Sequence, residues 1–160
     1  MKNIKTYIPA LCLALTLSLG LASCREEDPF LDRDVAPVLV DIVGAAFGAP
    51  IASEPTVGYK ATATKLTLSA RLLELDKTNI LDHTKGIDSI PVPNVPIKIT
   101  LRTGEILGEV TSNAQGLVTV DKTWAELGVP APKAGGVTKI SWTGTYKGIA
   151  FTRFSQIQAN

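Results

Sequence analysis

Residues 76–88 hold the densest group of oxygen-bearing side chains that could bind a metal ion. The group consists of Asp76, Asn79, Asp82 and Asp88. Carboxylate and amide oxygens are the ligands that Ca²⁺ prefers. The spacing is not that of an EF-hand loop, however, and Lys77 and Lys85 place positive charge among the candidate ligands. A weak metal site and a plain solvated loop therefore both remain open, and the two lysines favour the loop.

His83, the single histidine of the chain, lies in the same stretch. A hydrolytic triad needs a histidine beside an activated nucleophile, but no G-x-S-x-G elbow accompanies His83. The phosphate-binding pattern G-x-x-x-x-G-K-[ST] is absent as well. We therefore expect no catalytic residues and no cofactor. A small hydrolase or metal-dependent binder centred on this loop is the second alternative.

Two tryptophans could bind sugars if their rings were exposed. Trp142 alternates with Ile140, as a residue buried inside a β-sandwich does, so we expect it in the core. Trp124 is the weak candidate for ligand stacking, and its alternative is a ring that caps one end of the core.

The first residues are typical of an exported protein. Lys2 and Lys5 precede residues 8–22, which are almost wholly apolar or small. Because a membrane span needs about 20 residues, a retained membrane anchor is less favoured than a secretory signal peptide.

The end of this segment, Leu21-Ala22-Ser23-Cys24, resembles the lipobox of bacterial lipoproteins. In that family the cysteine thiol receives a diacylglyceryl group and the residues before it are removed. The resemblance implies a signal peptide over residues 1–23 and a palmitate-type lipid anchor on Cys24, with the membrane as partner. An ordinary secretory signal with an incidental cysteine is the alternative.

Residues 24–34 are expected to form the lipidated tether. No Asp directly follows Cys24, which implies transfer to the outer membrane. Arg25-Glu26-Glu27-Asp28 resembles the acidic export signal with which some Gram-negative bacteria display lipoproteins at the cell surface. The alternative is a charged run that only keeps the tether solvated, with the domain facing the periplasm.

Charge and cysteine content exclude several classes of function. The chain has 16 Lys and Arg against 15 Asp and Glu, and the signal peptide removes two of the lysines, so no basic face for nucleic acid is expected. Cys12 leaves with the signal peptide and Cys24 is lipidated. No disulfide, thiolate metal site or cysteine nucleophile is therefore expected.

The remaining chain, residues 35–160, is predicted to be one all-β domain. Side chains alternate with a period of two along most of it, as in half-buried strands. About seven strand candidates follow: 35–43, 65–73, 95–102, 106–111, 117–120, 137–146 and 149–157. The turn at residues 113–116 predicts that the two strands beside it form a hairpin. Thr123-Trp124-Ala125-Glu126 fits a capping box and predicts one short helical turn.

This pattern favours an immunoglobulin-like antiparallel β-sandwich. The segments 66–72, 91–99 and 107–120 resemble bacterial immunoglobulin-like domains of the invasin type, although residues 75–90 form an unusually long connection. Transthyretin-like and carboxypeptidase-regulatory-like sandwiches share the same short sequence motifs. The resemblance implies a spacer, adhesion or binding module without catalysis, and it implies no functional residues.

We therefore expect a non-enzymatic, surface-exposed lipoprotein of the outer membrane. Its role would be adhesion, carbohydrate capture or assembly with a protein partner. A periplasm-facing structural subunit of an outer-membrane complex, pairing through an exposed strand edge, is the first alternative.

Overall fold

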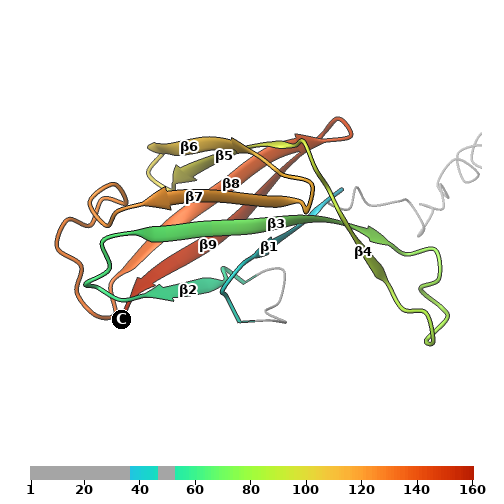
Figure 1. Cartoon of the computed structure of the whole chain (residues 1–160), viewed down its shortest axis with the longest axis horizontal. Coiled ribbons are helices and arrows are strands. Elements are labelled where there is room, and N and C mark those ends of the chain that lie inside the picture. The colour runs from blue at the N-terminus through green and yellow to red at the C-terminus, as the bar shows by residue number, and fades with distance from the viewer. Residues whose placement is uncertain (1–36, 47–52) are drawn as a thin grey trace, which may run out of the picture. The chain divides into compact units, whose positions relative to one another are not determined.

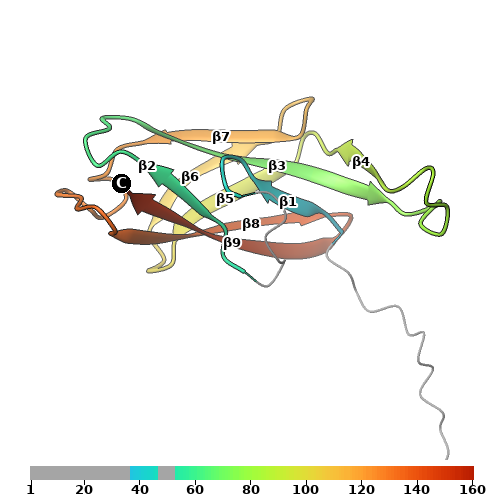
Figure 2. The same ribbon diagram turned by 90° about the horizontal axis from the view of Figure 1, so that it is seen from below.

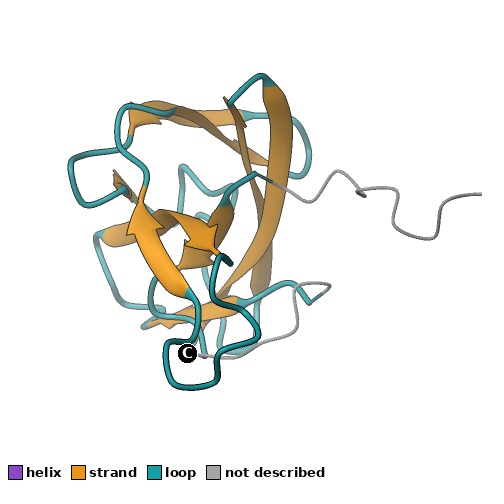
Figure 3. Cartoon of the chain, turned by 90° about the vertical axis from the view of Figure 1, so that its right-hand side faces the viewer, coloured by secondary structure: helices purple, strands orange, loops and turns teal. Residues whose placement is uncertain are grey.

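Strands dominate the part of the chain that the computed structural model describes, residues 37–46 and 53–160. These residues belong to the compact unit Ala36–Asn160. The described residues form nine strands and no helix (Figures 1 and 3). They are β1 (Leu39–Ile42), β2 (Thr56–Tyr59), β3 (Leu66–Asp76), β4 (Asp88–Pro91), β5 (Pro96–Leu101), β6 (Ile106–Thr111), β7 (Leu117–Lys122), β8 (Val137–Tyr146) and β9 (Ile149–Ala159).

The strands form two sheets that lie face to face (Figure 2). In the first sheet β3 pairs with β1 on one side, and with β7 and then β4 on the other. The second sheet has the order β2-β9-β8-β5-β6. The orders β1-β3-β7 and β9-β8-β5-β6 are those of strands A-B-E and G-F-C-C′ in immunoglobulin domains. The fold is therefore a β-sandwich, and the order of these strands is similar to that of immunoglobulin-like domains.

Alternating side chains fill the space between the sheets, as the period of two predicts. Leu66, Leu68, Ala70 and Leu72 of β3 are buried, and Ile97, Ile99 and Leu101 of β5 face them with Ile140 and Trp142 of β8. The indole Nε1 of Trp142 donates a hydrogen bond of 2.9 Å to Ser155 Oγ. The expectation that Trp142 is a core residue is confirmed.

Two strands lie outside the seven predicted strand candidates. β2 falls within residues 44–59 and pairs with β9 in parallel, so the second sheet is mixed and not purely antiparallel. β4 falls within the long connection 75–90 and pairs with the end of β3. A strand of four residues spans too few alternations for the pattern to be recognised in the sequence. Pairing with a long neighbouring strand determines whether such a segment forms a strand.

The predicted hairpin of residues 106–111 and 117–120 is wrong. The turn at Asn113–Gly116 exists, but β6 pairs with β5 and β7 pairs with β3, so the chain crosses between sheets there. Buried Ser112 fixes the crossing, because its Oγ donates to the Val92 carbonyl and accepts from the Val95 amide, each at 2.9 Å.

The predicted short helical turn is also absent. The capping-box hydrogen bonds do form, since the Glu126 amide donates to Thr123 Oγ1 at 3.3 Å and the Thr123 amide donates to Glu126 Oε2 at 2.7 Å. The segment nevertheless remains a turn. Gly128 takes a φ of 75°, and Pro130 lies two residues later, so no second helical turn can propagate.

Candidate functional site

The residues predicted to carry the lipid lie outside the described part of the chain. Leu21, Ala22, Ser23 and Cys24 belong to this group, together with the tether 24–34. Lipidation therefore stays a prediction from the sequence. Within residues 37–46 and 53–160, no helix has the length and apolar character needed to cross a membrane.

The candidate metal ligands have other partners. Asp76 accepts hydrogen bonds from the side chain and amide of Thr78, and Asp82 accepts the equivalent pair from Thr84. These hydrogen bonds, above all those from the threonine hydroxyls, lower the pKa of both carboxyl groups. Asp88 lies opposite Asp76 in the β3–β4 ladder. The Asn79 backbone carbonyl accepts from the amide of Asp82.

No three His, Cys, Asp or Glu side chains gather to hold a metal ion in the described residues. The two aspartates that cap turns are each bound to their own threonine, and Asn79 contributes its backbone to a turn. Three of the four predicted ligands thus take part in the turns of one hairpin, and Asp88 lies in its strand pair.

The prediction that Trp124 stacks on a ligand is wrong. Its side chain is 5% exposed, and its Nε1 donates a hydrogen bond of 3.2 Å to the Lys60 carbonyl. A buried ring with its only N–H donor satisfied inside the protein has no face to offer a sugar. Trp124 belongs to the same hydrophobic core as Leu127.

The structure reveals an apolar surface that the sequence reasoning missed. Side chains alternate along β1 and β3, so the residues between the buried positions point away from the core. The register places Leu39 opposite Leu73 and Leu73 opposite Pro91. Leu75, Leu117 and Val43 occupy neighbouring outward positions. We call Leu39, Val43, Leu73, Leu75, Pro91 and Leu117 the apolar outer face; all are half-buried or exposed.

A projecting hairpin exposes further apolar side chains. β3 and β4 extend past the turn that joins β8 to β9, beyond the second sheet (Figures 1 and 2). Four large aliphatic side chains of the hairpin are exposed: Ile80, Leu81, Ile87 and Ile90. Leu81, near the tip, is 97% exposed. Soluble proteins seldom expose contiguous apolar surface unless it binds something.

Polar contacts hold the base of the hairpin against the opposite sheet. Glu74 of β3 accepts a hydrogen bond of 2.9 Å from the Tyr146 hydroxyl and pairs with Lys147. The hydrogen bond from Lys147 and then that from Tyr146 lower the pKa of Glu74. Glu74 in turn raises the pKa of Tyr146 and of Lys147. The hairpin therefore leaves the sandwich in a defined direction.

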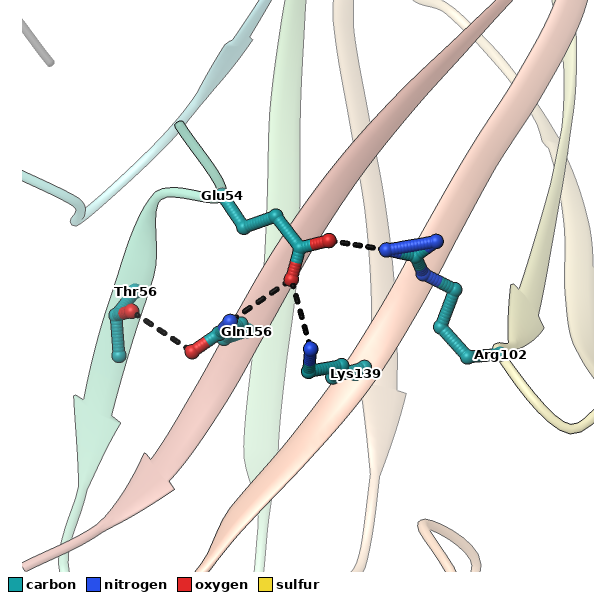
Figure 4. A network of polar contacts seen from close by, with 5 residues as sticks. All are labelled: Glu54, Thr56, Arg102, Lys139 and Gln156. Carbon is teal, nitrogen blue, oxygen red and sulfur yellow. Dashed lines mark hydrogen bonds and ion pairs between the residues drawn. The ribbon is translucent and has the colours of Figure 1, made fainter. Parts of the chain in front are cut away.

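The outer face of the second sheet has a different chemistry. The Glu54 carboxylate lies on this face, where it forms ion pairs with Arg102 and Lys139 and accepts a hydrogen bond from Gln156 (Figure 4). The hydrogen bond from Gln156 and that from Arg102 lower the pKa of Glu54 to about 2. The Arg102 guanidinium lies 3.6 Å from the ring centre of Phe154 and covers it. Charged and hydroxyl groups thus satisfy one another on this face.

A groove of about 480 Å³ lies beside this network. Its aliphatic lining comes from Leu101, Leu127, Val129 and Val137. Its two nearest cations, Arg102 and Lys139, are both paired with Glu54. The groove therefore offers an aliphatic wall with a neutralised rim, which is less distinctive than the apolar outer face.

One sequence signal could have revealed the apolar outer face. Thr67, Ser69 and Arg71 mark the outward side of β3, and the alternation continues to Leu73 and Leu75. Leucines on the solvent side of an otherwise polar alternation indicate a covered surface.

Comparison of the chain with protein-family models, with curated proteins and with solved structures gave no match.

Proposed function

We propose that this protein is a non-enzymatic lipoprotein of the cell envelope that binds a protein partner through its apolar outer face. Cys24 would carry the lipid anchor in the outer membrane, and residues 24–34 would hold the sandwich away from the bilayer. The single observation that carries the binding role is the row Leu39–Leu73–Pro91, which crosses three strands on the solvent side of the first sheet.

A protein partner fits this surface better than a sugar does. The row is aliphatic, and carbohydrate sites depend on aromatic rings and polar groups, whereas Trp124 and Trp142 are both buried. Large apolar patches on soluble domains are typical of protein–protein contacts. The exposed leucine and isoleucine side chains of the hairpin add further apolar surface outside this row.

A photo-crosslinking amino acid at position 73 tests the binding role in intact cells. We expect a crosslinked adduct of defined mass from position 73. The matched control is position 143, an exposed threonine position on the outward side of β8. Equal adducts from both positions, or none from position 73, would contradict the proposal.

Metabolic labelling with palmitate tests the anchor separately. The wild-type chain should be labelled and Cys24→Ser should not be. An unlabelled wild-type chain would remove the anchor from the proposal while leaving the binding surface untouched.

Protease treatment of whole cells decides between display at the cell surface and a periplasm-facing subunit. Digestion of the sandwich in intact cells indicates outward display. Protection that is lost when the outer membrane is opened indicates the periplasmic alternative.

A further inference from the structure

The apolar outer face contains one pair of opposite charges. Asp41 of β1 lies directly opposite Arg71 of β3 in the antiparallel register. Among the described residues, no other charged side chain occupies the outward positions of β1 and β3 between Val43 and Leu75. The pair has Leu39 and Leu73 on one side and Val43 and Ser69 on the other. A partner must therefore match an aliphatic surface that carries an anion and a cation side by side.

A second copy of the same chain meets this requirement by symmetry. In a two-fold interface the same surface serves both partners, so residue i contacts residue j and j contacts i. If the axis runs parallel to the strands, midway between β1 and β3, each cross-strand pair becomes a pair that faces across the interface. Arg71 then faces the second copy's Asp41, and Leu39 faces the second copy's Leu73.

A second two-fold axis is possible in the plane of the interface, but it is electrostatically disfavoured. An axis perpendicular to the strands at this row would place Asp41 against its own equivalent and Arg71 against its own equivalent. Like charges so placed cost several kcal/mol. Charge therefore selects one orientation, in which the strands of the two facing sheets run roughly parallel, as in aligned sheet packing.

We propose that a second copy of this chain covers the apolar outer face and forms a face-to-face homodimer. The proposal rests on the binding surface named under the proposed function and identifies its partner. Because the axis is parallel to the strands, Pro37 of both copies lies at the same end of the dimer. This arrangement suits two copies anchored in one membrane, since the described part of both chains then begins at the same end of the dimer.

Charge reversal combined with mixing tests the dimer. The full chain is studied by sedimentation equilibrium in density-matched detergent, with micelles in excess. Arg71→Glu leaves two anions on the face, and Asp41→Arg leaves two cations. Each variant alone should dissociate at least about tenfold more readily than the wild type, because like charges then meet across the axis.

The mixture of the two variants is the decisive measurement. In a one-to-one mixture, each anionic copy meets a cationic copy, and dimers should return to within about threefold of the wild-type affinity. A contact confined to one chain cannot be restored by mixing. Lys98→Glu, on the outward side of β5 in the other sheet, is the matched charge reversal and should leave the dimer unchanged.

Folding of each variant is checked by thermal melting at a concentration where the wild type is monomeric. Leu73→Ser adds a variant without a charge change, and it should weaken the dimer while the monomer still melts cooperatively. A wild-type chain that stays monomeric, or a mixture that stays dissociated although both variants are folded, overturns the homodimer.

The two proposals fail differently. A monomeric chain that still gives a defined crosslink to another protein from position 73 overturns the homodimer and leaves the proposed function standing. A monomeric chain with no crosslink from position 73 overturns both.

Discussion

The hydroxyl of Tyr146 donates a hydrogen bond of 2.9 Å to Glu74 Oε2, although the two residues are 72 positions apart. This contact joins the end of β8 in one sheet to the outgoing part of β3 in the other. It lies where the projecting hairpin leaves the sandwich, so it controls how firmly the hairpin is held.

Tyr146→Phe should loosen the hairpin without unfolding the sandwich. Amides of residues 74–76 and 88–90 should exchange about two- to fivefold faster, because a single partly buried charge-assisted hydrogen bond at the edge of the sandwich contributes modestly. Hydrogen–deuterium exchange read by mass spectrometry measures this. Thr145→Val, on the outward side of the same strand, is the control and should leave these amides unchanged. Uniformly faster exchange over both sheets would contradict a local role.

Ser155→Ala should destabilise the core by about 1–3 kcal/mol, because it leaves the indole N–H of Trp142 buried without an acceptor. Urea unfolding followed by tryptophan fluorescence measures the loss. Ser69→Ala removes a hydroxyl that contacts Thr119 at 3.1 Å on the exposed side of β3, and should change stability by less than about 0.5 kcal/mol. Equal losses of stability in the two variants would contradict the prediction that the buried Trp142 hydrogen bond contributes more than an exposed one.

Gly116→Ala should lower the free energy of unfolding by about 2–5 kcal/mol, because a strained backbone conformation and a steric clash of the added Cβ act together. Its φ is 70°, and a Cβ there would lie 2.4 Å from the carbonyl oxygen of Leu72. Gly148→Ala is the matched control. It has a φ of 80° with nothing within 4 Å of the added Cβ, so only the backbone penalty of about 1–2 kcal/mol applies. Chemical denaturation of both variants measures the difference, and a smaller loss for Gly116→Ala than for Gly148→Ala would contradict the turn geometry.

Glu54 should make the protein sensitive to acid. Its pKa is lowered from 4.5 to about 2, so the unfolded chain binds a proton at a higher pH than the folded chain does. The stabilisation from the charged carboxylate is therefore fully present above about pH 4.5 and is lost as the pH falls toward 2.

Glu54→Gln measures this contribution. The wild type should be more stable than the variant at pH 7, and the gap should close between pH 4.5 and 2. Denaturant unfolding across this pH range provides the curves. Glu105→Gln removes a carboxylate from the turn after β5 and serves as control. A gap between wild type and Glu54→Gln that is constant with pH would indicate that packing, and not charge, is lost in the variant.

Local patterns were enough to predict the class of fold. Alternation in residues 65–73, 95–102 and 137–146 placed the buried faces of β3, β5 and β8 correctly, because a strand with one face in water must alternate. The helical turn failed for a reason that is also local. The capping box at Thr123 forms its hydrogen bonds, but one turn cannot propagate into a helix against Gly128 and Pro130.

The candidate site was less predictable. Asp76 and Asp82 have the composition of metal ligands, yet each side chain bonds to the threonine two residues later. Trp124 has the chemistry of a sugar platform, yet it is buried with Leu127. A residue type sets what a side chain can do, whereas its neighbours decide whether the side chain is available.

The sequence by itself determined the strand-forming alternation, the positions of the turns and the case for a lipid on Cys24, because each depends on residues close together in the chain. Only the tertiary structure decided that residues 106–111 and 117–120 enter different sheets and that β2 runs parallel to β9. It alone also brought Leu39, Leu73 and Pro91 into one row. Strand pairing joins residues that lie far apart in the chain, and the period of each strand says which side faces the core but not which strand lies beside it.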